Sequence, residues 1–125
     1  MAGRPKGLDP HFAPLESEVM AAIWAAKGAL SVRQVLDALN RQRAEPLAYT
    51  TVMTVMNRLV GKGALTRNGT ARRYVYQATG TDAAAIAVRD LIRTYGDAAV
   101  AHLVEEARAN SEVMRRLRAL LEEPG

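Results

Sequence analysis

The segment from Tyr49 to Lys62 carries hydroxyl, amide and guanidinium groups at the spacing of one helix face. Wound at about 100° per residue, it gathers Val52, Val55, Met56, Leu59 and Val60 on one side and Thr50, Thr51, Thr54, Asn57, Arg58 and Gly61 on the other. The polar side lacks the carboxylates that ordinary exposed helix faces carry. Its groups can donate to base edges and phosphates, and a threonine methyl can contact the thymine methyl. The pattern indicates a helix suited to the major groove of DNA; the alternative is an exposed helix that merely tolerates threonine.

Basic residues surround this segment. Residues 1–79 hold 11 Lys/Arg against 5 Asp/Glu, a net +6, whereas residues 80–125 hold 6 against 8, a net −2. Between Arg41 and Arg73 there are seven basic residues, and Glu45 is the only acidic one. The first part of the chain therefore has the charge expected of a protein that binds a polyanion.

Other kinds of chemistry are poorly supplied. The chain has no cysteine, and His11 and His102 lie far apart, so we expect neither a metal site nor a catalytic constellation, and no cofactor. No apolar run approaches the roughly 18 residues of a membrane span, and the start lacks the apolar stretch of a signal peptide. We therefore expect a cytoplasmic protein that is not an enzyme and does not insert into a membrane.

Two helices are predicted before the threonine-bearing segment. Pro14 suits a first helical turn, and the helix should run to about Lys27, cover Leu15, Val19, Met20, Ile23 and Trp24, and stop at Gly28. Ser31 and Gln34 form a capping-box pattern that opens a second helix, which buries Val32, Val35, Leu36 and Leu39. Pro46 interrupts the helical pattern and leaves a short connector before Tyr49.

A hairpin is predicted after the threonine-bearing segment. Residues 65–67 and 73–77 form two short arms, and Asn68-Gly69 favours the positive φ angles of a tight hairpin turn. Its basic tip contains Arg67, Arg72 and Arg73, which would reach a phosphate backbone. Alternation places Tyr74 and Tyr76 together on the face that packs against the helices.

This order of elements predicts a mainly α fold with a small β-hairpin, namely a winged helix-turn-helix domain followed by a helical dimerisation region. We expect a flexible basic tail at residues 1–13, whose Arg4 could enter a minor groove, the winged domain at 14–79 and the dimerisation region at 80–125.

The region after Thr81 shows three thin amphipathic helices, separated near Gly96-Asp97 and Ser111. They are too thin to form a sizeable core alone, so we expect a second copy of the chain to cover their apolar stripes; the alternative is that they fold back on the winged domain. The residues assigned to this homodimer contact are Val88, Leu91, Ile92, Tyr95, Val100, Leu103, Val104, Met114, Leu117 and Leu121.

Several of these motifs together resemble the penicillinase repressor (BlaI/MecI) family of bacterial transcriptional regulators. They are Leu15-Glu-Ser-Glu-Val-Met-Ala-Ala-Ile-Trp24, Ser31-Val-Arg-Gln-Val35, Ala48-Tyr-Thr-Thr-Val-Met-Thr-Val-Met-Asn-Arg-Leu59, Lys62-Gly63 and Arg73-Tyr-Val-Tyr76, and the match spans about residues 14–121. The resemblance implies a homodimer on a dyad-symmetric DNA operator, with a recognition helix at residues 49–62 and a wing at residues 65–77.

On this basis we expect one set of residues to contact base edges and nearby phosphates, and a second set to contact the DNA backbone. The first set is Tyr49, Thr50, Thr51, Thr54, Asn57 and Arg58, and the second is Arg33, Arg67, Arg72 and Arg73. The rival hypothesis is a winged-helix adaptor that binds proteins and no DNA. Operator, target genes, inducing signal and the choice between repression and activation are left open.

This sequence departs from the family pattern at two points that concern induction. Staphylococcal-type members are inactivated by cleavage of an Asn-Phe bond, and the matching pair here is His102-Leu103; copper-responsive relatives use a cysteine motif, which this chain lacks. Sensing of a signal would fall to a separate membrane sensor or protease, as the resemblance implies.

Overall fold

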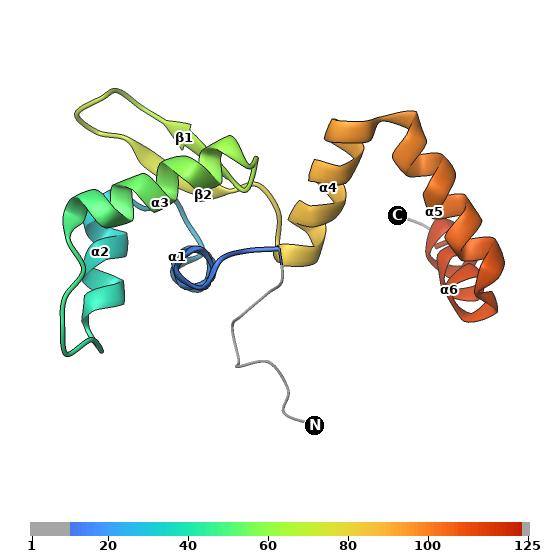
Figure 1. The fold of residues 1–125 in the computed structure, drawn as a ribbon, viewed down its shortest axis with the longest axis horizontal. Helices are drawn as coiled ribbons and strands as arrows, with labels where there is room; N and C mark the ends of the chain where they lie inside the picture. The colour runs from blue at the N-terminus through green and yellow to red at the C-terminus, as the bar shows by residue number, and fades with distance from the viewer. Residues whose placement is uncertain (1–10, 124–125) are drawn as a thin grey trace. The chain divides into compact units, whose positions relative to one another are not determined.

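Six helices and one antiparallel hairpin make up residues 11–123, the part of the chain that this computed structural model describes (Figure 1). The chain divides into two compact units, of which the first ends at Ala87 and the second begins at Val88. The division falls within α4 (Ala83–Tyr95). Residues 1–10, which include Arg4 and most of the expected basic tail, lie outside the described residues.

The first helix, α1 (Pro14–Ala26), has Pro14 in its first turn, where a missing backbone N–H costs nothing. Glu16 reaches back to accept a hydrogen bond from the backbone N–H of Ala13 at 2.8 Å, which satisfies one of the exposed donors at the start of the helix. The helix stops one residue earlier than predicted. Lys27, not Gly28, takes the left-handed conformation, with φ 57°, and its N–H donates to the carbonyl of Trp24.

The second helix, α2 (Val32–Asn40), begins with the predicted capping box. Ser31 Oγ accepts from the Gln34 N–H at 3.1 Å, and Gln34 Oε1 accepts from the Ser31 N–H at 2.9 Å. The connector that follows is closed by a reciprocal pair: Asn40 Oδ1 accepts from the Leu47 N–H at 2.8 Å, and Asn40 Nδ2 donates to the Leu47 carbonyl at 3.2 Å. The start of the next helix, α3 (Tyr49–Gly61), is thereby held close to the end of α2.

The hairpin consists of β1 (Leu65–Asn68) and β2 (Val75–Ala78), and it lies beside α3 in Figure 1. The prediction of a tight turn at Asn68-Gly69 was wrong. Asn68 still pairs with Val75, so residues 69–74 form a six-residue loop in which only Gly69 has positive φ, at 100°. The Arg73 N–H donates to the Thr70 carbonyl at 2.8 Å and closes this loop internally. Arg73 and Tyr74 consequently belong to the loop and not to a strand.

The core of the first unit lies between α1, α2, α3 and the hairpin. It contains Val19, Met20, Ile23, Val35, Val52, Val55, Met56, Leu59, Leu65, Tyr76 and Ile86. Phe12, placed in the N-terminal tail by the sequence analysis, is also buried here. Trp24 is partly buried, as its expected core role requires, and its indole N–H donates to the Gly80 carbonyl at 2.9 Å. Leu30 exchanges two backbone hydrogen bonds with Tyr76 and so extends the hairpin by one bridge.

The second unit contains the end of α4, α5 (Asp97–Ala109) and α6 (Ser111–Leu121), and α5 packs against α6. Asn110 caps α6 by accepting from the backbone N–H groups of Glu112 and Val113, both at 3.1 Å. Ala107 is buried. Most large apolar side chains of this unit are exposed: Val88, Leu91, Ile92, Tyr95, Val100, Leu103, Val104, Val113, Leu120 and Leu121. Across residues 11–123, every helix falls short of the length and hydropathy that crossing a lipid bilayer requires.

Candidate nucleic-acid interface

The two faces of α3 are divided as the periodicity predicted. Val52, Val55, Met56 and Leu59 are buried and Val60 is partly buried, whereas Thr50, Thr51, Thr54, Asn57 and Arg58 are exposed. The exposed side contains no carboxylate. Thr54 Oγ1 donates to the Thr50 carbonyl at 2.8 Å, so its hydroxyl proton is used within the helix and its remaining lone pairs and methyl group can meet another molecule.

A groove of about 550 Å³ lies between the start of α2, α3 and the hairpin loop. Six predicted DNA-contacting residues line it: Arg33, Tyr49, Asn57, Arg67, Arg72 and Arg73. The other four, Thr50, Thr51, Thr54 and Arg58, are on α3 but outside the groove lining. The structure thus places a cationic groove beside the exposed polar face of α3.

Two arginines of the groove are placed by aromatic rings. The guanidinium carbon of Arg33 lies 5.8 Å from the centre of the Tyr49 ring, and that of Arg67 lies 4.3 Å from the centre of the Tyr74 ring. A cation over an aromatic face is attracted by the ring quadrupole while its N–H donors stay available at the edge. The rings therefore restrict where these charges can be without neutralising them.

Asn57 connects α3 to the hairpin. Its Oδ1 accepts from the Tyr76 hydroxyl at 3.2 Å and from Arg67 Nη1 at 3.3 Å. Arg67 and Tyr76 are cross-strand partners, so their side chains project from the same face of the hairpin. The sequence analysis did not foresee this cluster, nor that Ser31, Met53 and Tyr76 line the groove. The strand register is the signal that would have revealed the cluster.

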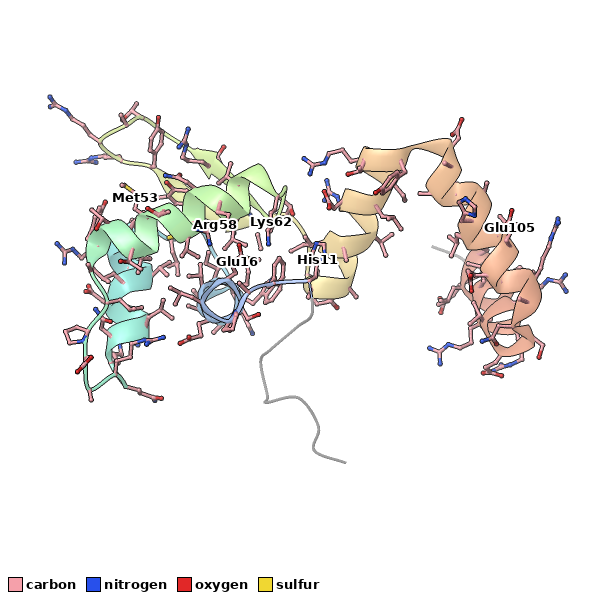
Figure 2. The ribbon with its side chains drawn as sticks, viewed as in Figure 1. His11, Glu16, Met53, Arg58, Lys62 and Glu105 are labelled. Carbon is pink, nitrogen blue, oxygen red and sulfur yellow. The ribbon has the colours of Figure 1, made fainter. Side chains whose placement is uncertain are left out.

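Part of the basic character counted in the sequence is neutralised by ion pairs. Arg43 Nη2 lies 2.7 and 2.8 Å from the two carboxylate oxygens of Glu18. Lys62 Nζ lies 2.7 Å from Oε1 of Glu16, whose carboxylate is buried. Figure 2 shows Arg58 and Lys62 on the side of α3 that faces α1 and Glu16. The four arginines that line the groove take part in neither of these ion pairs.

Glu16 itself is electrostatically adapted to this position. Burial raises the pKa of its carboxyl, but the hydrogen bonds from Lys62 and from the Ala13 N–H, together with the charges of Lys62 and Arg58, outweigh burial. The net effect is a pKa below the usual 4.5. Glu16 is therefore ionised near neutral pH and serves as a structural anchor beside the polar face.

Metal-binding clusters of three or more His, Cys, Asp or Glu residues do not occur within residues 11–123. His11 belongs to the first unit and His102 to the second, where His102 Nδ1 lies 3.3 Å from Glu105 Oε2.

Three helices followed by an antiparallel hairpin, with an exposed polar third helix beside a basic hairpin loop, define a winged helix-turn-helix protein. The sequence model of the penicillinase repressor family matches residues 12–123, and the chain belongs to this family of transcriptional regulators. It is similar to the transcriptional regulator BlaI of Mycobacterium tuberculosis, from strain CDC 1551 / Oshkosh and from strain ATCC 25618 / H37Rv. Each is 36% identical over 116 residues, an alignment covering 86% of this chain and 83% of the relative.

Proposed function

We propose that the chain is a sequence-specific transcriptional repressor that binds a dyad-symmetric DNA operator as a homodimer and acts in the cytoplasm. The observation that carries the proposal is the exposed, carboxylate-free face of α3 beside a groove lined by four arginines. Hydroxyl, amide and guanidinium groups match base edges and phosphates, and their position on a recognition helix lets them reach both.

The residues divide by position on this surface. Thr50, Thr51, Thr54, Asn57 and Arg58 project from α3 toward base edges and adjacent phosphates, with Tyr49 at the start of the helix. Arg33, Arg67, Arg72 and Arg73 surround the groove and suit the sugar-phosphate backbone. The charge of Arg58 also acts on Glu16, and Figure 2 shows Arg58 on the side of α3 that faces α1, so of its two assigned partners a phosphate suits Arg58 better than a base.

The dimer proposal rests on the second unit. Eight of the ten residues assigned to the dimer contact, together with Val113 and Leu120, have exposed fractions from 39% to 76%, whereas Met114 and Leu117 are half-buried. Large apolar side chains left exposed in this number indicate an interaction site. A second copy would cover it and would bring two recognition helices to successive major grooves, about 34 Å apart. As the family resemblance implies, release from DNA would require a separate membrane sensor or protease. We assign this step to no site among the described residues of the chain.

The decisive experiment selects bound sequences from a random duplex pool and then measures affinity by fluorescence anisotropy at several salt concentrations. We expect an enriched palindrome and an affinity that falls steeply with salt, because phosphate contacts release counterions. A transcription assay with the palindrome over a promoter then separates repression from activation. If no duplex sequence is enriched even at low salt, the DNA-binding proposal is wrong and the adaptor hypothesis replaces it.

Thr50→Glu provides a matched variant for this test. A carboxylate in the first turn of α3 stabilises the helix through its dipole, so the fold should be kept, but the charge repels DNA phosphates. We expect a loss of affinity of about tenfold or more. Thr81→Glu makes the same change at an exposed position before α4, outside the groove, and should have little effect.

A further inference from the structure

The side-chain amide of Asn57 is held in one orientation by two donors from the hairpin. We propose that Asn57 is a donor-only reader of one base position in each half of the operator, with Tyr76 and Arg67 as the residues that position it. This inference rests on the proposed DNA-binding function and specifies what one residue of that surface recognises.

The orientation follows from the chemistry of the partners. Arg67 Nη1, 3.3 Å away, can only donate, so the Asn57 atom facing it must be the carbonyl oxygen. The Tyr76 hydroxyl, 3.2 Å away, donates to the same oxygen. A flipped amide would direct an N–H group at a guanidinium, which cannot accept, and would lose the bond from Arg67. With both lone pairs of Oδ1 occupied, the outward polar group of Asn57 is its NH₂.

The two partners are themselves fixed in place. Tyr76 is only 1% exposed, and its backbone exchanges hydrogen bonds of 2.7 and 3.0 Å with Leu30. Arg67 is stacked 4.3 Å from the centre of the Tyr74 ring. Because both residues are paired across the hairpin, their donors converge on Asn57 from one rigid element. The amide therefore meets DNA with its orientation already set.

A donor-only amide has a narrower preference than an unrestrained asparagine. An unrestrained asparagine pairs with adenine in two places, accepting from N6 and donating to N7. With Oδ1 occupied, Asn57 can only donate, to O6 or N7 of guanine, O4 of thymine or N7 of adenine. It gains no second bond from adenine, and the N4 amino group of cytosine offers it no acceptor. The position it contacts should favour guanine, which offers two acceptors, over thymine and adenine, which offer one each, and should disfavour cytosine.

The experiment determines base-preference profiles from random duplex pools for wild type and variants. In wild type we expect cytosine to be disfavoured about tenfold at one position per half-site. Asn57→Ala should bring all four bases at that position to within about twofold, and Asn57→Asp, which presents acceptors, should shift preference toward cytosine. Tyr76→Phe frees a lone pair of Oδ1, so adenine should gain about threefold to tenfold relative to guanine.

Thr66→Val is the matched control, because it removes a hydroxyl of the same hairpin from an exposed position on β1, outside the groove lining. Its profile should equal that of wild type, and thermal unfolding of each variant checks that the fold is kept. A uniform loss of affinity from Asn57→Ala, or a Tyr76→Phe profile identical to wild type, would overturn the inference while leaving DNA binding intact. Failure of wild type to enrich any sequence would instead overturn the proposed function, and this inference with it.

Discussion

The ammonium nitrogen of Lys62 lies 2.7 Å from Oε1 of Glu16, so the residue after α3 is tied to the first turn of α1. The same oxygen accepts from the Ala13 N–H at 2.8 Å, and the Glu16 side chain is buried. One carboxylate therefore caps one helix and fixes the end of another. This ion pair links the end of α3 to the start of α1.

The lowered pKa of Glu16 predicts a pH dependence of stability. Just below the usual pKa of 4.5, Glu16 is protonated in the unfolded chain but still ionised in the folded chain. Unfolding therefore binds a proton, and the free energy of unfolding falls as pH falls. The stabilisation is fully present above pH 4.5 and is lost as pH drops through the folded pKa. We expect Glu16→Gln to be less stable near neutral pH by about 1–3 kcal/mol and to lose less stability on acidification.

Urea denaturation between pH 3 and 7 measures this difference. Glu105→Gln is the control, since this carboxylate in the second unit is largely exposed and its pair with His102 is a surface contact (Figure 2). Parallel curves for wild type and Glu16→Gln across the acid range would show that Glu16 is not the anchor described here.

Removal of one arginine from the groove should weaken DNA binding without changing preference. Arg72→Ala removes a backbone contact, so all sequences should lose affinity by a similar factor and the slope of log affinity against log salt should flatten by about one unit. Arg115→Ala on α6 removes the same charge from outside the groove. An unchanged salt slope for Arg72→Ala would place Arg72 away from the phosphates.

Gly69→Ala should strain the hairpin loop. Gly69 has φ 100°, and a Cβ there would lie 2.4 Å from the Arg73 carbonyl oxygen. We expect a loss of about 1–3 kcal/mol in the free energy of unfolding, and weaker DNA binding because Arg72 and Arg73 lie in the same loop. Gly28→Ala, where a Cβ meets nothing within 4 Å, should be nearly neutral in the same urea titration.

Leu103→Glu should disrupt the homodimer. Leu103 is 50% exposed on α5, and a carboxylate at the centre of an apolar contact would be buried without a partner. Sedimentation at micromolar concentration should then show the 13.6 kDa monomer, together with a large loss of operator affinity. His102→Glu adds the same group to the neighbouring residue, on a different face of α5, and should stay dimeric. Dimers formed by Leu103→Glu would exclude this surface from the interface.

Local patterns predicted most of the fold because they report on single elements. The apolar spacing of α3 gave its buried face, and the Ser31 to Gln34 pattern gave the start of α2. The conformation of Lys27 was missed because a residue with a Cβ takes the left-handed state only when the helix end requires it. The adjacent glycine was the more obvious candidate.

The candidate site was predicted less completely because it depends on register and long-range pairing. The predicted arms, residues 65–67 and 73–77, left the pairing register open, whereas the six-residue loop sets Arg67 opposite Tyr76 and so creates the cluster on Asn57. The ion pair between Lys62 and Glu16 joins residues that are 46 positions apart, and no local sequence pattern predicts it. Charge counting along the sequence therefore overstated how much of the basic segment is available to a ligand.

The two hydrogen bonds between Asn40 and Leu47 have a kinetic consequence. They close the connector between α2 and α3 in the free protein. The α3 helix can therefore bind DNA without a prior search among connector conformations. Little ordering entropy of this segment is then lost on association. The speed of encounter should accordingly be governed by diffusion and by the field of the groove arginines, and not by a slow rearrangement of the helix pair.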